Sequence, residues 1–195
     1  MHSIGINLYM FKTFKLSEND LKDIDYQLSV TPKLMSDPEL YADELAEVQH
    51  SALLIPNSLD KYGKTLLNFG PEETVTVYYT SKSKELNYIL NSIFDIPSDA
   101  QPFYTSVISY HEGGGLKQHH DPYSDLTTNI LLGDEFEPGH LYINNKLVDF
   151  YKRGQALSFH GKVTGHRVTP VKKGLRRTLS VWYKIPSINS KHSLI

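Results

Sequence analysis

Apolar positions at helical spacing run through three segments of the first hundred residues. Segments 17–28 and 83–94 each place leucine and isoleucine three and four positions apart, which predicts an amphipathic helix in each. A third helix is predicted to begin at Asp37-Pro38, a capping carboxylate followed by a proline suited to the first helical position, and to end before Pro56. The β-branched and aromatic run at 74–79 predicts a strand.

From residue 102 onward the pattern changes to short apolar runs separated by Gly, Pro, Asn and Asp. These runs predict strands near 103–110, 126–132, 140–144, 147–151, 155–160, 165–170 and 176–184. Asn144-Asn145 lies between two of them and is typical of a hairpin turn. Short strands that follow a helical start predict a barrel or jelly roll with packed helices.

Composition and charge exclude several kinds of chemistry. The chain has no cysteine, which excludes disulfides, thiolate zinc sites and a cysteine nucleophile. The 20 basic and 22 acidic residues give a net charge of −2, which argues against nucleic-acid binding driven by overall charge. No apolar stretch reaches the roughly 18–20 residues that span a bilayer, and no signal-peptide pattern is seen. We therefore expect a cytoplasmic protein without a membrane partner.

Candidate chemistry is concentrated in segment 110–121, YHEGGGLKQHHD. Residues two apart point to the same side of an extended chain, so His119 and Asp121 are predicted to project together. A distant histidine, either His160 or His166, would complete a set of two imidazoles and one carboxylate. Such a set holds Fe(II) on one side and leaves coordination positions open. No GK[ST] follows the triple glycine 113–115, so we expect a flexible rim beside the metal rather than a phosphate loop.

The order of motifs in the second half is more specific than any one of them. It comprises Tyr110, His119-x-Asp121, Pro138-Gly139, Gly154, His166, Pro170-Val171, Gly174 and Arg176. This order resembles the 2-oxoglutarate- and Fe(II)-dependent dioxygenases, and within them the prolyl and lysyl hydroxylase branch, over roughly residues 103–184. The resemblance implies that His119, Asp121 and His166 bind Fe(II). It also implies that Arg176 binds the far carboxylate of 2-oxoglutarate and that Tyr110 lines the same pocket.

Alternation along the last predicted strand separates two adjacent arginines. One face carries Arg176, Thr178, Ser180 and Trp182, and the other carries Arg177, Leu179, Val181 and Tyr183. The first face is predicted to line the pocket, with Trp182 near the co-substrate or substrate, and the second to pack on the N-terminal helices. Some hydroxylases use a tyrosine for the co-substrate carboxylate where this chain has Leu131. We expect Asn129 or Thr127 to provide that second contact.

Taken together, these patterns predict an α+β, mainly β fold with a double-stranded β-helix (jelly roll) core. We expect one domain over 1–195, with helical and strand support in 1–101, the catalytic core in 102–185 and a tail in 186–195. The implied function is hydroxylation of a prolyl or lysyl side chain in a protein or peptide, using Fe(II), O2 and 2-oxoglutarate, which is converted to succinate. Ascorbate is the candidate reductant.

Two other functions remain open at this point. A free amino acid or other small metabolite is the alternative substrate, because no peptide-docking module is seen outside the core. A catalytically silent jelly roll that acts as a binding module is the alternative of another class. A nucleic-acid demethylase is disfavoured, because such relatives favour a second arginine further along the last strand, in the region of Trp182.

Overall fold

The computed structural model describes residues 11–30, 56–59, 65–68, 74–79, 84–133 and 135–189. The helices are α1 (Glu18–Val30), α3 (Lys84–Phe94) and α4 (Pro186–Asn189). The first seven strands are β1 (Lys12–Lys15), β2 (Pro56–Leu59), β3 (Thr65–Asn68), β4 (Thr74–Tyr79), β5 (Gln101–Tyr110), β6 (Leu116–His119) and β7 (Leu126–Leu131). The remaining strands are β8 (Phe136–Glu137), β9 (Leu141–Ile143), β10 (Lys146–Val148), β11 (Gln155–Phe159), β12 (His166–Val168), β13 (Lys173–Gly174) and β14 (Arg176–Lys184).

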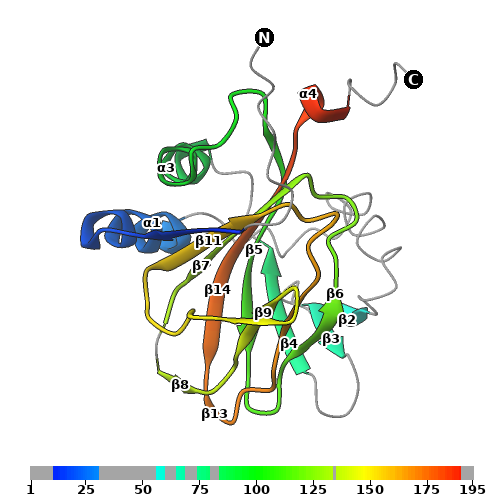
Figure 1. The fold of residues 1–195 in the computed structure, drawn as a ribbon. Coiled ribbons are helices and arrows are strands. Elements are labelled where there is room, and N and C mark those ends of the chain that lie inside the picture. The colour runs from blue at the N-terminus through cyan, green and yellow to red at the C-terminus, as the bar shows by residue number, and fades with distance from the viewer. Residues whose placement is uncertain are drawn as a thin grey trace.

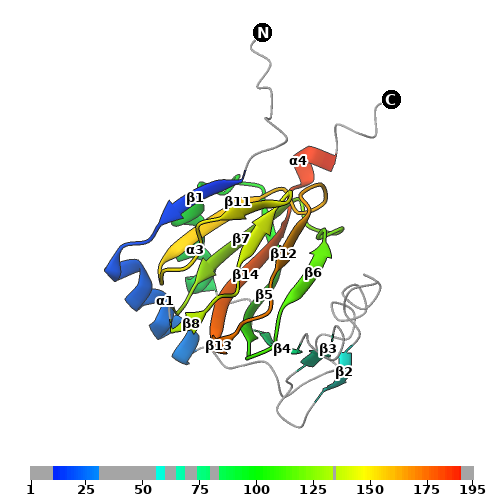
Figure 2. The ribbon, with the colours of Figure 1, turned by 60° about the horizontal axis from the view of Figure 1, so that its bottom comes forward.

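Two antiparallel sheets form the body of the molecule (Figure 1). The large sheet has the order β1-β11-β7-β14-β5-β4-β3-β2, and the small sheet has the order β10-β9-β12-β6. Figure 2 shows the small-sheet strands β12 and β6 lying across the large sheet. Strands distant in sequence are neighbours in both sheets, as in a jelly roll. The predicted mainly β architecture with few helices is confirmed.

Each predicted helix that falls within the described residues is present. Ser17 caps α1, because its hydroxyl accepts a hydrogen bond from the backbone N–H of Asp20 at 3.2 Å while the Asp20 carboxylate accepts one from the N–H of Ser17 at 2.9 Å. α3 begins at Lys84, one residue after the predicted start. The helix predicted from Asp37 to before Pro56 lies outside the described residues.

The predicted strands are present with small shifts at their ends, and six strands were not predicted: β1, β2, β3, β6, β8 and β13. β1 and β6 have the sequences KTFK and LKQH, in which polar residues dominate. Each is an edge strand among the described elements, so it lacks the apolar alternation that a strand buried on one face shows. The hairpin at Asn144-Asn145 is confirmed, with φ of 49° and 62° at the two positions, as a primed turn requires.

Two apolar clusters lie on opposite faces of the large sheet. The inner cluster, between the sheets, combines residues of both and includes Tyr110, Leu131, Ile143, Leu157 and Phe159. The outer cluster joins the other face of the large sheet to α1 and α3, which lie together on that side (Figure 1). Of the described helices, none is long and apolar enough to cross a membrane.

Substitutions in α3 can test the packing of this helix in the outer cluster. Leu90 is fully buried there, whereas Tyr88 on the same helix is 79% exposed. We expect Leu90→Ala to lower the free energy of unfolding by about 3 kcal/mol, because the truncation leaves a cavity. Tyr88→Ala, the matched control, should change it by less than about 0.5 kcal/mol. Urea unfolding measures both, and equal effects would contradict this packing.

Candidate metal centre

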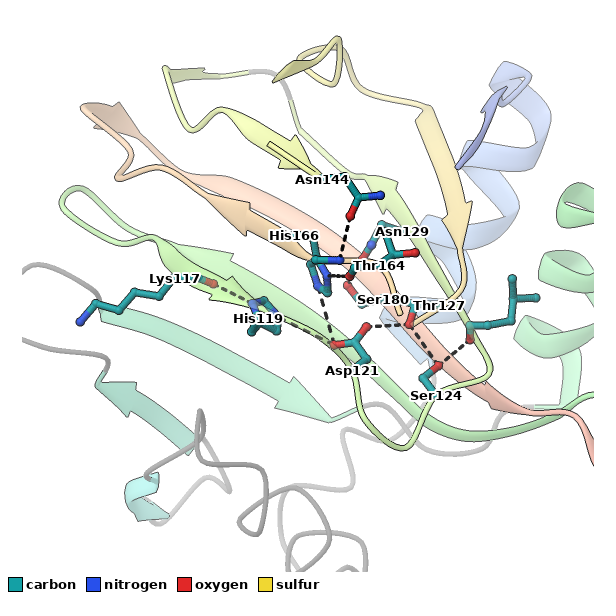
Figure 3. Close-up of polar contacts among 12 residues, drawn as sticks. Lys117, His119, Asp121, Ser124, Thr127, Asn129, Asn144, Thr164, His166 and Ser180 are labelled. Carbon is teal, nitrogen blue, oxygen red and sulfur yellow. Dashed lines mark hydrogen bonds and ion pairs between the residues drawn. The ribbon is translucent and has the colours of Figure 1, made fainter. Parts of the chain in front are cut away.

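Three side chains converge where β6 ends and β12 begins, at one end of the small sheet. His119 ends β6, His166 begins β12, and the two residues are directly paired in the sheet register. Asp121 follows β6 by two residues. The Nε2 atoms of His119 and His166 each lie 3.7 Å from Oδ1 of Asp121, and the potential ligand atoms of the group all lie within 4.8 Å of one another (Figure 3). A single metal ion can contact all three from this arrangement.

Backbone carbonyls determine which nitrogen of each ring carries the proton. Nδ1 of His119 lies 2.7 Å from the carbonyl oxygen of Lys117, and Nδ1 of His166 lies 3.1 Å from that of Thr164. A carbonyl only accepts a hydrogen bond, so Nδ1 is the protonated nitrogen in both rings. With the proton on Nδ1, each ring presents Nε2 toward Asp121. This orientation by a second hydrogen bond is usual for metal-ligating histidines.

The electrostatics keep His119 neutral. Burial is the main cause that lowers its pKa to about 4, with the neighbouring His166 acting in the same direction and Asp121 opposing. At neutral pH the His119 ring is therefore uncharged. Because a metal competes with protons for the ring nitrogen, a low pKa leaves the ligand atom available.

The two oxygens of the Asp121 carboxylate have different surroundings. Oδ1 faces both imidazoles, whereas Oδ2 accepts a hydrogen bond of 2.6 Å from the hydroxyl of Thr127. The backbone N–H of Asp121 donates to the carbonyl of Gly161 at 3.0 Å. Both the side chain and the backbone of Asp121 are thus held.

Of the two histidines considered as the third ligand, the structure places His166, and not His160, beside His119 and Asp121. In the described part of the chain, the only group suited to a metal comprises His119, Asp121 and His166. His160 follows the end of β11, and its buried Nδ1 has no hydrogen-bond partner there. The His160 ring is not part of the His119–Asp121–His166 group.

Arg176 lies on the inner face of the large sheet as a buried cation. Its side chain is among the most buried of the described residues, with the residue 1% exposed, and its guanidinium carbon lies 5.0 Å from the ring centre of Tyr110 and 5.6 Å from that of Phe150. Burial lowers the pKa of Arg176 and the Tyr110 phenol opposes this effect, but an arginine keeps its charge in proteins. Among the described residues its Nε has no hydrogen-bond partner and no carboxylate is paired with it. A buried cation without an anion fits a bound carboxylate.

The other predicted site residues lie on the same inner face. Tyr110 is paired with Arg176 across β5 and β14, and burial raises the pKa of its phenol. Asn129 is paired with Ser180 across β7 and β14, and its side-chain oxygen accepts a hydrogen bond from the Ser180 hydroxyl at 2.5 Å. Trp182 is half-buried and packs against the inner cluster. Arg177 is exposed on the opposite face, as the alternation predicts.

Two structural details differ from the sequence-based expectations. Thr127, considered only as a contact for the co-substrate, has its hydroxyl on Asp121. The glycine segment 113–115 is no flexible rim: Gly113 N–H donates to the carbonyl of Val171 at 2.8 Å, and Val171 N–H donates to that of Gly114 at 2.9 Å. These bonds attach the loop before β6 to the segment between β12 and β13. Neither feature has a local sequence signal, because each depends on how the chain folds around the site.

Comparisons with known proteins were made by sequence and by structure. No family model and no curated protein sequence matches the chain. A prolyl hydroxylase from Trichoplax adhaerens, solved with a hypoxia inducible factor peptide fragment, is similar with a TM-score of 0.56 and 14% identity, covering 95% of this chain and 87% of that one. The viral collagen prolyl hydroxylase of Paramecium Bursaria Chlorella virus-1 gives 0.52 and 15%, covering 89% and 94%. The chain has the fold of these two prolyl hydroxylases.

This oxygenase fold is not restricted to hydroxylases. The α-ketoglutarate-dependent carbocyclase SnoK of nogalamycin biosynthesis is similar with a TM-score of 0.54 and 11% identity, covering 90% of this chain and 79% of that one. The predicted jelly-roll core is therefore confirmed. In this chain, the inner side of the oxygenase fold carries both the His119–Asp121–His166 group and Arg176.

Gly139 provides the space in which Arg176 packs. A Cβ atom at Gly139 would lie 2.8 Å from Cγ2 of Val171 and 3.0 Å from Cδ of Arg176, closer than packed atoms tolerate. The predicted Pro138-Gly139 turn thus places a glycine where the backbone approaches the buried arginine. Only a residue without a side chain fits there without displacing a neighbour.

We expect Gly139→Ala to lower the free energy of unfolding by about 1–3 kcal/mol, because the added methyl group overpacks the site. Gly133→Ala is the matched control, since a Cβ there meets nothing within 4 Å. It should change stability by less than about 0.5 kcal/mol. Urea unfolding of both variants checks this, and a neutral Gly139→Ala would show that the arginine has room to move.

Proposed function

We propose that the chain is a 2-oxoglutarate- and Fe(II)-dependent dioxygenase that hydroxylates a prolyl or lysyl side chain of a protein or peptide. One observation carries the proposal. Two imidazoles and one carboxylate converge on one point, on the same inner side of the fold as a buried arginine that is paired with no carboxylate among the described residues. The first group suits Fe(II), and the arginine suits the carboxylate of an organic acid.

His119, Asp121 and His166 would hold the metal and leave its remaining positions open. Bound there, Fe(II) with 2-oxoglutarate supplies the activation of dioxygen, in which one oxygen atom enters a substrate C–H bond and the other enters succinate as CO2 is lost. The His119 imidazole contributes a lone pair that needs no deprotonation at neutral pH, because its pKa is lowered to about 4. The carboxylate contributes the negative charge that a divalent cation favours.

Arg176 would bind and orient the far carboxylate of the co-substrate through the fork of its guanidinium. The rings of Tyr110 and Phe150 flank that guanidinium and exclude water from it. In this dry surrounding the attraction between cation and carboxylate is stronger than in water. Asn129 and Trp182, on the same face, are proposed as further contacts to the co-substrate or substrate.

The peptide substrate is supported by the two prolyl hydroxylases of the same fold, one of which was solved with a peptide fragment. A small-molecule substrate is the second candidate, favoured by the likeness to a carbocyclase of nogalamycin biosynthesis. A silent binding module is disfavoured, because such a module has no need for a converging metal group and a buried arginine that no carboxylate of the described residues pairs with.

Turnover provides the direct test. With Fe(II), ascorbate and 2-oxoglutarate, we expect succinate formation that increases when a suitable peptide is added, together with a product heavier by one oxygen atom in mass spectrometry. Panels of prolyl and lysyl peptides and of free amino acids separate the two substrate classes. Asp121→Ala should abolish the activity, whereas Asp23→Ala, an exposed carboxylate on α1, should leave it unchanged. Wild-type protein that forms no succinate with any substrate would favour the binding module.

Co-substrate binding separates the two adjacent arginines. We expect Arg176→Lys to weaken 2-oxoglutarate binding about 10-fold or more, because an ammonium group cannot replace a bidentate fork. Arg177→Lys is the matched control on the exposed face and should change the affinity less than about twofold. Calorimetric titration in the presence of Mn(II) measures both variants, after circular dichroism has shown that they fold. Equal effects would contradict the assignment of Arg176.

A further inference from the structure

Two buried hydroxyl groups, those of Thr127 and Ser124, lie on the Oδ2 side of the Asp121 carboxylate. The hydroxyl of Thr127 lies 2.6 Å from Oδ2 of Asp121 and 3.0 Å from the hydroxyl of Ser124, which in turn lies 2.7 Å from the carbonyl oxygen of Leu126 (Figure 3). Thr127 is 1% exposed and Ser124 is fully buried. This chain of hydroxyls faces away from the histidines, on the side of the carboxylate that a metal would not occupy.

The Thr127 hydroxyl carries one proton, and this determines the direction of its hydrogen bond with Asp121. A charged carboxylate only accepts, so its contact with Thr127 requires the single hydroxyl proton of Thr127. The 2.6 Å length is typical of a hydroxyl that donates to a charged carboxylate. The carbonyl of Leu126 also only accepts, so its 2.7 Å contact takes the proton of Ser124. The Thr127 hydroxyl stays directed at Asp121.

The two oxygens of the Asp121 carboxylate therefore have different partners. Oδ1 lies 3.7 Å from Nε2 of both histidines, and Oδ2 is bound by Thr127. A carboxylate with both oxygens free can bind a metal through either one or both of them. Here only Oδ1 is available without breaking a buried hydrogen bond.

The surrounding packing allows the two hydroxyls little freedom. Thr127 lies in β7, which is paired on both sides, with Phe159 of β11 and Trp182 of β14 as its direct neighbours. A Cβ at Gly161 would lie 2.7 Å from the Thr127 hydroxyl and 2.8 Å from Cβ of Ser124, so the backbone at that glycine is in close contact with the pair. The hydroxyl that holds Asp121 is thus attached to the large sheet, while both histidines belong to the small sheet.

We propose that Thr127 is a positioning residue that makes Asp121 a one-oxygen metal ligand. The inference rests on the proposed function and specifies how the site keeps coordination positions open. A second carboxylate oxygen at the metal would occupy a position that the co-substrate or dioxygen requires. Holding Oδ2 on the large sheet prevents this.

Metal binding without turnover tests the inference. Co(II) is titrated into the full chain in the absence of 2-oxoglutarate, with calorimetry for the affinity and visible absorption for the ligand field. We expect Thr127→Val, which keeps the shape but loses the hydroxyl, to weaken Co(II) binding about 10-fold or more and to change the absorption spectrum. Thr127→Ser retains the hydroxyl and should restore the spectrum, with an affinity within about threefold of wild type.

The neighbouring Thr128 supplies a matched control. It is equally buried, at 1% exposed, but is adjacent to Thr127 in the strand and so points to the opposite face. Thr128→Val should leave Co(II) affinity and spectrum unchanged. Thermal unfolding of the metal-free variants separates a loss of folding from a loss of positioning.

The outcomes are distinguishable. If wild-type protein binds Co(II) and Thr127→Val binds it within twofold with the same spectrum, the positioning role is wrong while the proposed function stands. If Thr127→Ser fails as Thr127→Val does, the residue acts through its methyl group, and the inference is again wrong. If wild-type protein binds no Co(II), the proposed function fails and the inference fails with it.

Discussion

The alternation of side chains along β14 is the constraint on which the rest of the structure depends. The strand runs between β5 and β7 in the large sheet, and its odd and even positions face different surroundings. One set, with Leu179 and Val181, completes the outer cluster under the helices. The other, with Arg176 and Ser180, faces the small sheet. A register slip of one residue would exchange Arg176 with Arg177 and bury polar groups under the helices, so the register is strongly specified.

The inner face holds a buried charge that is paired with no carboxylate among the described residues, the guanidinium of Arg176. This group opposes stability, because a desolvated charge is costly when it is unpaired. Stability comes instead from the two apolar clusters, which bury the opposite face and the space between the sheets. A site that is unsatisfied by itself is one that gains free energy from binding a cation and an organic acid. Such a balance between stability and function is common in active sites.

The candidate centre joins the two sheets. His119 and His166 belong to neighbouring strands of the small sheet, whereas Thr127, which holds Asp121, belongs to the large sheet. The geometry of the three potential ligands therefore depends on the distance between the sheets, which the inner cluster maintains. In the same way, Gly139 lies where a turn approaches the side chain of Arg176. Substitutions far from the three ligands can thus act on them through packing.

The sequence alone determined the features that follow from local periodicity. Helical spacing predicted α1 and α3, whereas α4 lies in the segment 186–195 that was expected to be a tail. Short apolar runs predicted the central strands, and alternation placed Arg176 and Arg177 on opposite faces. Among the strands that were not predicted, β1 and β6 lie at a sheet edge, where apolar alternation is not needed. The resemblance already selected His166 over His160, and the tertiary structure brings its imidazole to His119 and Asp121. Only the tertiary structure gave the Thr127 hydroxyl to Asp121 and attached the glycine segment 113–115 to Val171. Strand pairing and packing, rather than local pattern, bring these groups together.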